Sequence, residues 1–321
     1  MSEFNITVLD GDTIFPKSCR RWDSFSQIGN FNFYGLTSSE QILSHIGNSD
    51  AILTNKVVIS KDIIKLSPRL KYIGVLATGY NNVDIEAAQK AGITVTNIPA
   101  YSTSSVAQTA ISLLLAIISR VEHYSIQNRN GRWAKSPAFT YLDFNWHELA
   151  GKTFGVVGLG NTGSATAAIA AALGMRIAVF TSKAQEQLPH GYVKMGIDEL
   201  FEKSDVVSLH CPLTPNTRNL VNAERLAKMK NTAILINTSR GPVVDENALA
   251  EALSANIISA AGLDVMTNEP PLPDNPLLRL DNCYITPHLA WASVEAKNRL
   301  LDIAFNNLNS FIQGNPVNII K

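Results

Sequence analysis

The chain has 321 residues, a length that exceeds one usual hydrophobic core and predicts about two domains. Its 27 basic and 27 acidic residues give a formal charge of zero, which argues against binding to nucleic acid or to an anionic membrane. Three scattered cysteines predict no disulfide framework, and no apolar run approaches the ~20 residues of a membrane span. We therefore expect a cytoplasmic protein that acts on small molecules.

Short apolar runs rich in β-branched residues alternate with helix-like segments over the first hundred residues. Ser60 is a candidate N-cap of one helix, and Gly92 marks the end of another. Strands that alternate with helices predict a parallel sheet. The predicted strands cover residues 6–9, 51–54, 72–76 and 93–96, and the predicted helices cover residues 60–66 and 83–90.

Residues 104–128 form a longer segment whose apolar positions predict one continuous helix. Ile111, Leu114 and Ile118 recur at helical spacing, and the apolar content exceeds what one buried stripe requires. Two explanations stay open, burial within the chain and contact with a second subunit. The aromatic residues of segment 130–146 show no periodicity, so we expect an extended loop there.

The alternation of strands and helices resumes after this loop and predicts a second, doubly wound sheet that binds a nucleotide. The last helix, residues 293–311, follows the final strand and is expected to return to the first domain. The domains are therefore predicted as residues 1–100 with 292–321 and residues 101–291. The predicted strands of the second sheet cover residues 153–157, 176–180, 205–209, 233–237, 258–263 and 282–286.

A glycine pattern joins the first strand of this second sheet to an alanine-rich helix. Gly158 permits a tight turn, Gly160 lets the backbone approach a pyrophosphate, and Gly163 lets the helix pack closely on the strand. The free N–H groups at the start of the helix, near Asn161 and Thr162, are expected to face the phosphates. A purely structural turn remains the alternative.

Charged residues follow three strands at the edge where a parallel sheet binds its ligand. Arg240 stands between a strand and Gly241, where its planar guanidinium suits a carboxylate ligand. His288 ends the last strand, and Glu269 follows the strand before it. Because a carboxylate beside an imidazole fixes its tautomer, these two residues predict an acid–base pair. The structural alternatives are a surface cation, a solvated loop charge and a core histidine.

The other five histidines show no spacing typical of metal ligands, so no metal site is predicted. His210 and Cys211 also follow a strand, but no acid lies close to them in the sequence. We expect these two residues, with Pro212, to form a wall of the cofactor pocket rather than a catalytic group.

Five ordered motifs together resemble the D-isomer-specific 2-hydroxyacid dehydrogenases over essentially the whole chain. They are GVVGLGNTG (155–163), HCPLTPNT (210–217), LINTSRGPVVDENAL (235–249), GLDVMTNEPP (262–271) and ITPHLA (285–290). Within the family, ATGYNNVD (77–84) and the opening VLDGDT look most like glycerate dehydrogenases, also called hydroxypyruvate reductases. The resemblance implies an α/β fold with a Rossmann dinucleotide-binding domain and a flavodoxin-like substrate domain.

The resemblance also implies a role for each candidate residue. Arg240 would bind the substrate carboxylate and carbonyl, His288 would be the acid–base residue, and Glu269 would hydrogen-bond to His288. Thr78 and Gly79 would bind the substrate carboxylate through their backbone N–H groups, and the 104–128 helix would form the contact of a homodimer. Cofactor contacts would come from Thr109, Gly158, Gly160, Asn161, Thr162, Gly163, Thr181, Ser182, Lys183, Cys211, Pro212, Thr217, Thr238, Ser239, Arg240, Asp264 and His288.

One departure from the family pattern bears on the choice of cofactor. Members that prefer NAD usually carry an Asp where this chain has Thr181, and an acid there repels the 2′-phosphate of NADP. Thr181, Ser182 and Lys183 offer two hydroxyls and a cation instead. We expect NAD(P)(H) as the cofactor, with NADP(H) slightly favoured.

The predicted reaction is hydride transfer between a nicotinamide cofactor and a small 2-oxo or 2-hydroxy acid of D configuration. Hydroxypyruvate with D-glycerate and glyoxylate with glycolate are the expected substrate pairs. Two alternatives stay open, a co-repressor-like protein that senses the cofactor on the same fold and a phosphoglycerate dehydrogenase-type enzyme. Neither a nucleic acid nor a membrane is expected as a partner.

Overall fold

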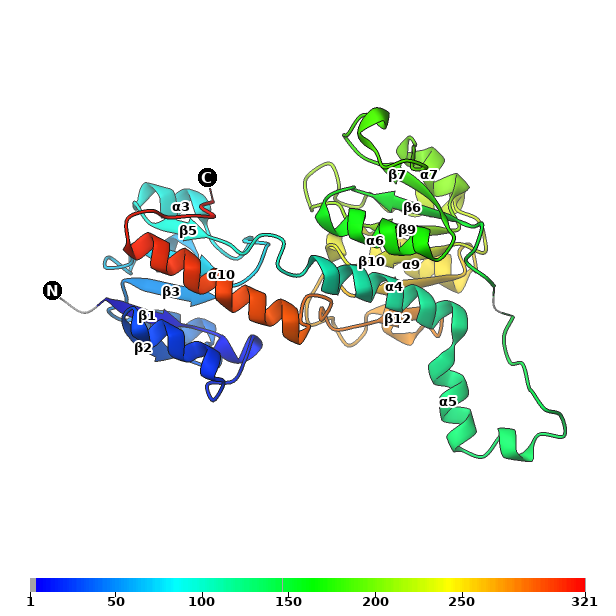
Figure 1. The fold of residues 1–321 in the computed structure, drawn as a ribbon, viewed down its shortest axis with the longest axis horizontal. Helices are drawn as coiled ribbons and strands as arrows, with labels where there is room; N and C mark the ends of the chain where they lie inside the picture. Colours follow the sequence, from blue (N-terminus) through cyan, green and yellow to red (C-terminus); the bar gives the residue numbers. More distant parts are fainter. Residues whose placement is uncertain (1–3, 146, 321) are drawn as a thin grey trace. The chain divides into compact units, whose positions relative to one another are not determined.

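The computed structural model describes residues 4–145 and 147–320 of the chain. The chain folds into two compact units, Met1–Ser102 with Ala292–Lys321 and Thr103–Trp291 (Figure 1). The boundary predicted between residues 100 and 101 lies two residues from this division. Each unit has its own sheet and its own buried apolar core.

The first unit is built on a five-stranded parallel sheet. Its strand order, β2-β1-β3-β4-β5, is the flavodoxin-like order that the resemblance implies. The strands are β1 (Asn5–Val8), β2 (Asn30–Phe33), β3 (Ala51–Thr54), β4 (Tyr72–Val75) and β5 (Thr94–Thr96). The helices are α1 (Ile42–Ile46), α2 (Lys61–Lys65), α3 (Ile85–Lys90) and α10 (Val294–Ile312), with 3-10 helices η1 (Gly11–Thr13), η2 (Arg20–Gln27) and η3 (Ser39–Gln41).

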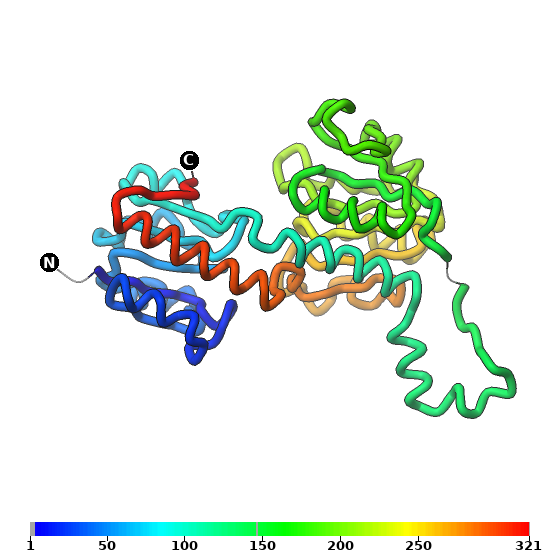
Figure 2. Tube along the Cα trace, viewed as in Figure 1, coloured from blue at the N-terminus to red at the C-terminus, as the bar shows by residue number. Residues whose placement is uncertain are grey.

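α10, the C-terminal helix, completes the core of the first unit. Figure 2 shows this helix in red beside the blue and cyan strands of the N-terminal segment. Ser293 caps the helix by accepting the N–H of Ala296 at 3.1 Å, and Leu300 is fully buried along it. The buried side chain of Asn307 donates to the carbonyl of Asn97 at 3.0 Å. The C-terminal segment is thus part of the unit that the first hundred residues begin.

β2 is absent from the predicted strands, although its sequence NFNF alternates a polar residue with an aromatic one. Phe31 and Phe33 pack on Trp22, with ring centroids 6.1 and 5.5 Å from the indole. Alternation with a period of two is the usual signal of a half-buried strand, and β2 lies at the edge of its sheet. The predicted strands of this unit are recognised as apolar runs rich in β-branched residues, and NFNF contains no β-branched residue.

The second unit is built on a seven-stranded parallel sheet in the order β12-β11-β10-β9-β6-β7-β8 (Figure 1). Numbered from β6, this arrangement contains the doubly wound order 3-2-1-4-5-6 of dinucleotide-binding folds. The predicted α/β class with two parallel sheets is therefore confirmed. The strands are β6 (Thr153–Val157), β7 (Arg176–Phe180), β8 (Val193–Lys194), β9 (Val206–Leu209), β10 (Ile234–Asn237), β11 (Ala260–Leu263) and β12 (Cys283–Ile285). The helices are α4 (Thr103–Ser119), α5 (Val121–Arg129), α6 (Asn161–Ala172), α7 (Ile197–Lys203), α8 (Ala223–Lys228) and α9 (Glu246–Ser254), with 3-10 helices η4 (Trp133–Lys135), η5 (Gln185–Gln187), η6 (Gly241–Val243) and η7 (Pro276–Arg279).

The prediction of one continuous helix over residues 104–128 is wrong, because two helices occupy this segment. α4 and α5 meet at Arg120, whose φ of 49° lies in the left-handed region, and the pair is bent by 57°. α4 buries Ala110 and Leu114 in the core shared with the sheet and α6, whereas none of the residues of α5 is buried. The Arg120 guanidinium lies 4.7 Å from the ring centre of Phe144, a cation–π contact that favours the bend. No single helix among the described residues has the length and apolarity to cross a membrane, and α4 and α5 meet those criteria only when taken together.

Candidate active site

The glycine turn after β6 meets the end of β9 at the point where the strand order reverses. Gly158 has a φ of 95°, and a Cβ there would lie 2.9 Å from the backbone of His210 and Cys211. Gly163 faces the carbonyl oxygen of Gly158 too closely for any side chain to fit. Gly160, by contrast, precedes α6 with no atom within 4 Å of its Cβ position. The turn therefore leaves no room for side chains at Gly158 and Gly163, and it has open space at Gly160, just before α6. A pyrophosphate bound at the start of a helix needs that space.

His210 and Cys211 follow β9 and are both uncharged at neutral pH. Burial lowers the pKa of the His210 imidazole to about 4, and its Nε2 shares a hydrogen bond of 2.9 Å with the hydroxyl of Ser208. Burial raises the pKa of the Cys211 thiol to about 11. Neither group transfers a proton readily near pH 7, which argues against a catalytic role. The prediction that both residues form a wall of the cofactor pocket is therefore kept.

The loop after β7 carries the residues expected to select the cofactor. The hydroxyl of Thr181 accepts the N–H of Lys183 at 3.3 Å, and the Lys194 ammonium of β8 donates to the carbonyl of Lys183 at 2.6 Å. Ser182 and Lys183 are exposed. A second cation, Lys194, thus reaches the end of β7, and no sequence pattern near the glycine turn indicated it.

Asn237, the last residue of β10, shapes the turn that carries Arg240. Its side chain donates to the carbonyl of Arg240 at 3.0 Å and accepts the N–H and the hydroxyl of Ser239 at 3.0 and 2.8 Å. No pattern in the sequence singled out Asn237, although Asn is a frequent turn residue. The buried hydroxyl of Thr238 has no hydrogen-bond partner among the described residues, which fits a turn that receives a polar ligand.

Arg240 lies beside the loop that follows β11. Its Nη1 donates to the carbonyl of Ser239 at 2.7 Å, which occupies one of the five donors of the half-buried guanidinium. Gly241 approaches the backbone of Met266 so closely that no side chain fits between them. This contact places the Arg240 turn against the loop that carries Glu269.

Asp264 follows β11 and holds the loop that carries His288. The residue is 1% exposed, and its Oδ1 accepts the hydroxyl of Thr286 at 2.6 Å. The same carboxylate accepts the N–H of Leu289 at 3.0 Å and that of Ala290 at 2.9 Å. Burial raises the pKa of Asp264 in spite of these bonds. The carboxylate that was predicted to line the cofactor pocket is engaged with the His288 loop, a role that the sequence did not indicate.

The structure brings His288 and Glu269 together as a hydrogen-bonded pair. Nδ1 of His288 lies 2.6 Å from Oε2 of Glu269, and Oε1 of Glu269 accepts the N–H of Met266 at 3.0 Å. The His288 side chain is 26% exposed, so its ring reaches solvent while the carboxylate holds Nδ1. Nε2 is the ring atom that is then left to exchange a proton with a substrate.

The other predicted cofactor residues of the second unit hold loops or start helices. Thr217 donates to the carbonyl of Pro212 at 2.6 Å, which closes the loop after β9. Thr109 lies on α4, where its hydroxyl donates to the carbonyl of Ser105 at 3.0 Å. Asn161 and Thr162 are the first residues of α6. Their contacts with a cofactor remain predictions.

Thr78 and Gly79 belong to the first unit and follow β4. The Thr78 hydroxyl donates to the carbonyl of Ile98 at 2.8 Å. The backbone carbonyl of Thr78 accepts a hydrogen bond from the side-chain amide of Asn97 at 2.7 Å. These bonds occupy the side chain and the carbonyl of Thr78. Its backbone N–H is the group that the resemblance assigns to the substrate.

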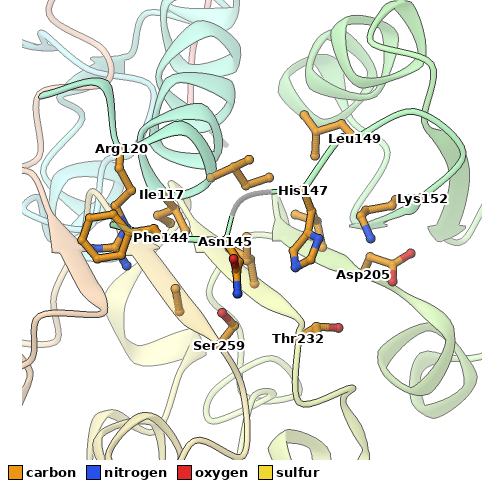
Figure 3. A pocket seen from close by; sticks show the side chains of 14 residues that line it. Ile117, Arg120, Phe144, Asn145, His147, Leu149, Lys152, Asp205, Thr232 and Ser259 are labelled. Atoms are coloured by element: carbon orange, nitrogen blue, oxygen red, sulfur yellow. The ribbon is translucent and has the colours of Figure 1, made fainter. Parts of the chain in front are cut away.

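A pocket of about 250 Å³ in the second unit lies at the amino-terminal edge of the sheet (Figure 3). Its lining includes Arg120, Phe144, His147 and Asp205 and none of the predicted site residues. Ligands of an open parallel sheet bind at the carboxyl ends of its strands, so this pocket is not the candidate active site. Within the part of the chain that the structure describes, no three His, Cys, Asp or Glu residues form a group that could hold a metal ion.

The carboxyl edge of the second sheet lies within a segment that matches a known family. Residues 111–290 match the model described as D-isomer specific 2-hydroxyacid dehydrogenase, NAD binding domain. The chain belongs to the D-isomer specific 2-hydroxyacid dehydrogenases. The resemblance inferred from five motifs is thus confirmed, and the glycine turn is part of an NAD-binding domain.

Relatives of this dehydrogenase match it over most of their length. A hydroxypyruvate reductase of Blautia hydrogenotrophica is 43% identical over 98% of this chain and 99% of that protein. A glycerate dehydrogenase of Methylorubrum extorquens is 40% identical and covers 88% of each protein. A solved acyclic imino acid reductase in complex with NADPH and D-Arg has a TM-score of 0.87 at 31% identity, over 99% of this chain and 100% of that one. The dehydrogenase is therefore an oxidoreductase that uses a nicotinamide cofactor.

Two substitutions in the glycine turn separate cofactor binding from folding. A methyl group at Gly160 enters open space where the backbone is predicted to approach the pyrophosphate, so Gly160→Ala is expected to raise the Kd for NAD(P)H roughly tenfold at an unchanged Tm. Gly163→Ala is expected to lower Tm as well, because its methyl group overlaps the carbonyl of Gly158. Thermal melting and fluorescence titration measure both quantities. A wild-type Kd in the Gly160→Ala protein would contradict this placement of the cofactor.

Proposed function

We propose that the dehydrogenase reduces hydroxypyruvate to D-glycerate or glyoxylate to glycolate. The observation that carries this proposal is the pair of His288 and Glu269, joined at 2.6 Å next to the turn that holds Arg240. An imidazole, its carboxylate partner and a guanidinium are the groups that reduction of a 2-oxo acid requires. Relatives named hydroxypyruvate reductase, glycerate dehydrogenase and glyoxylate reductase support the substrate class.

The roles of the residues follow from the charge that develops during the reaction. A reduced nicotinamide cofactor, held by the glycine turn of Gly158, Gly160 and Gly163, would supply a hydride for C2 of the 2-oxo acid, and negative charge would then grow on the carbonyl oxygen. Protonated His288 donates a proton to that oxygen from Nε2, while Glu269 orients the ring and stabilises its positive charge. Arg240 binds the carboxylate of the substrate and stabilises the growing charge. The backbone N–H groups of Thr78 and Gly79 provide further donors to the carboxylate.

His288→Ala and Arg240→Ala test these roles directly. Loss of the general acid is expected to lower kcat about 10²–10⁴-fold. Arg240→Ala is also expected to raise KM, because a contact with the substrate carboxylate is lost in the ground state. Steady-state kinetics with hydroxypyruvate and glyoxylate, on variants whose folding is checked by circular dichroism, measure both effects. Near-normal kinetics in both variants would remove this mechanism, and a wild-type protein that binds cofactor but reduces no 2-oxo acid would favour a co-repressor-like sensor.

Glu269→Gln tests the pair through the rate of reduction. The carboxylate of Glu269 lies 2.6 Å from Nδ1 of His288 and fixes the tautomer and the orientation of the ring, so that Nε2 is left to act on the substrate. A Gln side chain can turn its NH2 group towards Nδ1 and then no longer fixes either. We expect kcat for reduction to fall roughly tenfold or more, with a smaller effect on KM. A wild-type kcat in folded Glu269→Gln would show that Glu269 does not act on His288.

We infer that NADPH is accepted at least as well as NADH. Thr181 and Ser182 offer hydroxyls at the end of β7, and the Lys194 ammonium donates to the backbone of Lys183 in the same loop. A 2′-phosphate there meets donors rather than a repelling carboxylate, and a charge-assisted hydrogen bond of this kind contributes ~1.5–3 kcal/mol. The solved imino acid reductase, which binds NADPH on the same fold, supports this preference.

Two variants test the cofactor preference. Thr181→Asp is expected to favour NADH, because its carboxylate repels the 2′-phosphate. Lys183→Ala is expected to weaken NADPH roughly tenfold or more and to spare NADH, since only the phosphate contact is lost. The ratio of kcat/KM for the two cofactors is the measurement. A wild-type ratio of about one hundred in favour of NADH would contradict the inference.

We also propose a homodimer through α4, α5 and the loop that follows them. None of the residues of α5 is buried, and the loop exposes Phe139 by 89% and Leu142 by 77%. Val121, Ile126 and Trp133 are exposed as well, so exposed apolar side chains recur from α5 through this loop, as they do at protein–protein interfaces. A symmetric dimer, in which both subunits use the same patch, is the commonest way to cover them. The cytoplasmic location remains a prediction from the sequence.

A further inference from the structure

A buried carboxylate lies in the first unit where β1 ends. Asp10 is 3% exposed, and it accepts three consecutive backbone N–H groups after β3. These are the N–H groups of Asn55 at 2.8 Å, Lys56 at 2.6 Å and Val57 at 3.3 Å. Burial raises the pKa of Asp10, whereas the three hydrogen bonds favour its charged form. The carboxylate therefore fixes the path of the segment 55–57.

The segment that Asp10 fixes is joined to the substrate loop, which we define as residues 78–83. Asn82 of this loop donates its side-chain amide to the carbonyl of Val57 at 3.0 Å. The carbonyl of Asn82 accepts the N–H of Ile59 at 2.7 Å, so a second bond joins the substrate loop to the chain just after the segment 55–57. One side of the substrate loop thus rests on residues that Asp10 holds in place.

The other side of the substrate loop rests on residues that follow β5. Thr78 bonds to Ile98 through its hydroxyl and to Asn97 through its carbonyl, at 2.8 and 2.7 Å. Asn97 in turn accepts a hydrogen bond from Asn307 of α10. A turn held from both sides presents its N–H groups in one geometry, which binding a carboxylate by backbone donors requires.

We propose that Asp10 is a positioning residue for substrate binding, which acts through the segment 55–57 and Asn82 on the Thr78–Gly79 turn. This assignment rests on the proposed function, in which that turn binds the carboxylate of the 2-oxo acid. Asp10 acts through backbone hydrogen bonds. Without it, three N–H groups lose their common acceptor and the substrate loop loses one of its two supports.

Asp50 provides a matched control in the same sheet. It is also 3% exposed, but it precedes β3 and therefore lies at the amino edge of the sheet. It accepts the N–H of Asn5 at 3.1 Å and a hydrogen bond from the Lys71 ammonium at 2.9 Å. Its removal takes away a buried, hydrogen-bonded carboxylate and leaves the carboxyl edge unchanged. A purely stabilising role of Asp10 predicts the same kinetic result for both aspartates.

The test compares Asp10→Ala, Asn82→Ala and Asp50→Ala in the full chain, with hydroxypyruvate and glyoxylate as substrates. We expect Asp10→Ala and Asn82→Ala to raise KM for the 2-oxo acid roughly ten- to hundredfold, with a smaller effect on kcat. Asp10→Asn, which keeps one acceptor oxygen, is expected to give an intermediate KM. The Kd for NADPH is expected to stay at the wild-type value, because the cofactor residues lie in the second unit. Asp50→Ala is expected to lower Tm and to keep the wild-type KM.

Three results would overturn the assignment in different ways. A KM within about twofold of wild type in folded Asp10→Ala and Asn82→Ala shows that the support is not needed. A rise in KM that Asp50→Ala shares shows that general loss of stability is the cause. If Asp10→Ala does not fold, Asn82→Ala decides the question, since it removes the same link from the loop side. A wild-type protein that reduces no 2-oxo acid overturns the proposed function itself and the assignment with it.

Discussion

Parallel pairing of the strands is the constraint on which the rest of the structure depends, because it collects every carboxyl end at one edge of each sheet. In the second unit, turns that are far apart in the sequence meet at that edge. Gly158 touches the backbone after β9, and Gly241 touches the backbone after β11. These contacts leave no room for side chains, so the loops after β6 and β9 pack directly on each other, as do the loops after β10 and β11.

Two buried carboxylates fix the loops that this constraint brings together. Asp264 and Asp10 each follow a strand, and each accepts three hydrogen bonds from a loop that follows a different strand. A loop lacks the regular backbone hydrogen bonds of a helix or a sheet, and burial of an N–H group without a partner costs free energy. A carboxylate offers several acceptor positions at once, so one side chain can order a whole turn. The same arrangement appears in both units, once for the loop that carries His288 and once for the segment 55–57, on which the substrate loop rests.

The sequence predicts this structure well wherever a local pattern carries the information. The bounds of β3, β6 and β7 match because β-branched residues fill them, and the glycine turn follows from its spacing. The contact between His288 and Glu269 could be predicted because the two residues follow β12 and β11, which are neighbouring parallel strands. The left-handed conformation of Arg120 could not be predicted, since its guanidinium packs on Phe144 and Tyr284, which lie far from it in the sequence. Nor could the bonds of Asp264, whose partners lie 22 to 26 residues further along the chain.

The chain leaves the first unit at Ser102 and returns to it at Ala292. During synthesis the second unit is one continuous segment, and it can fold as soon as it has emerged from the ribosome. The first unit lacks α10 (Val294–Ile312), with its buried Leu300 and Leu308, until that segment has been made. The apolar face that α10 covers in the N-terminal sheet therefore stays exposed to solvent while the second unit, Thr103–Trp291, is translated. Exposed apolar surface of this kind promotes aggregation, so the order of synthesis makes the N-terminal sheet a surface on which a chaperone can act during that interval.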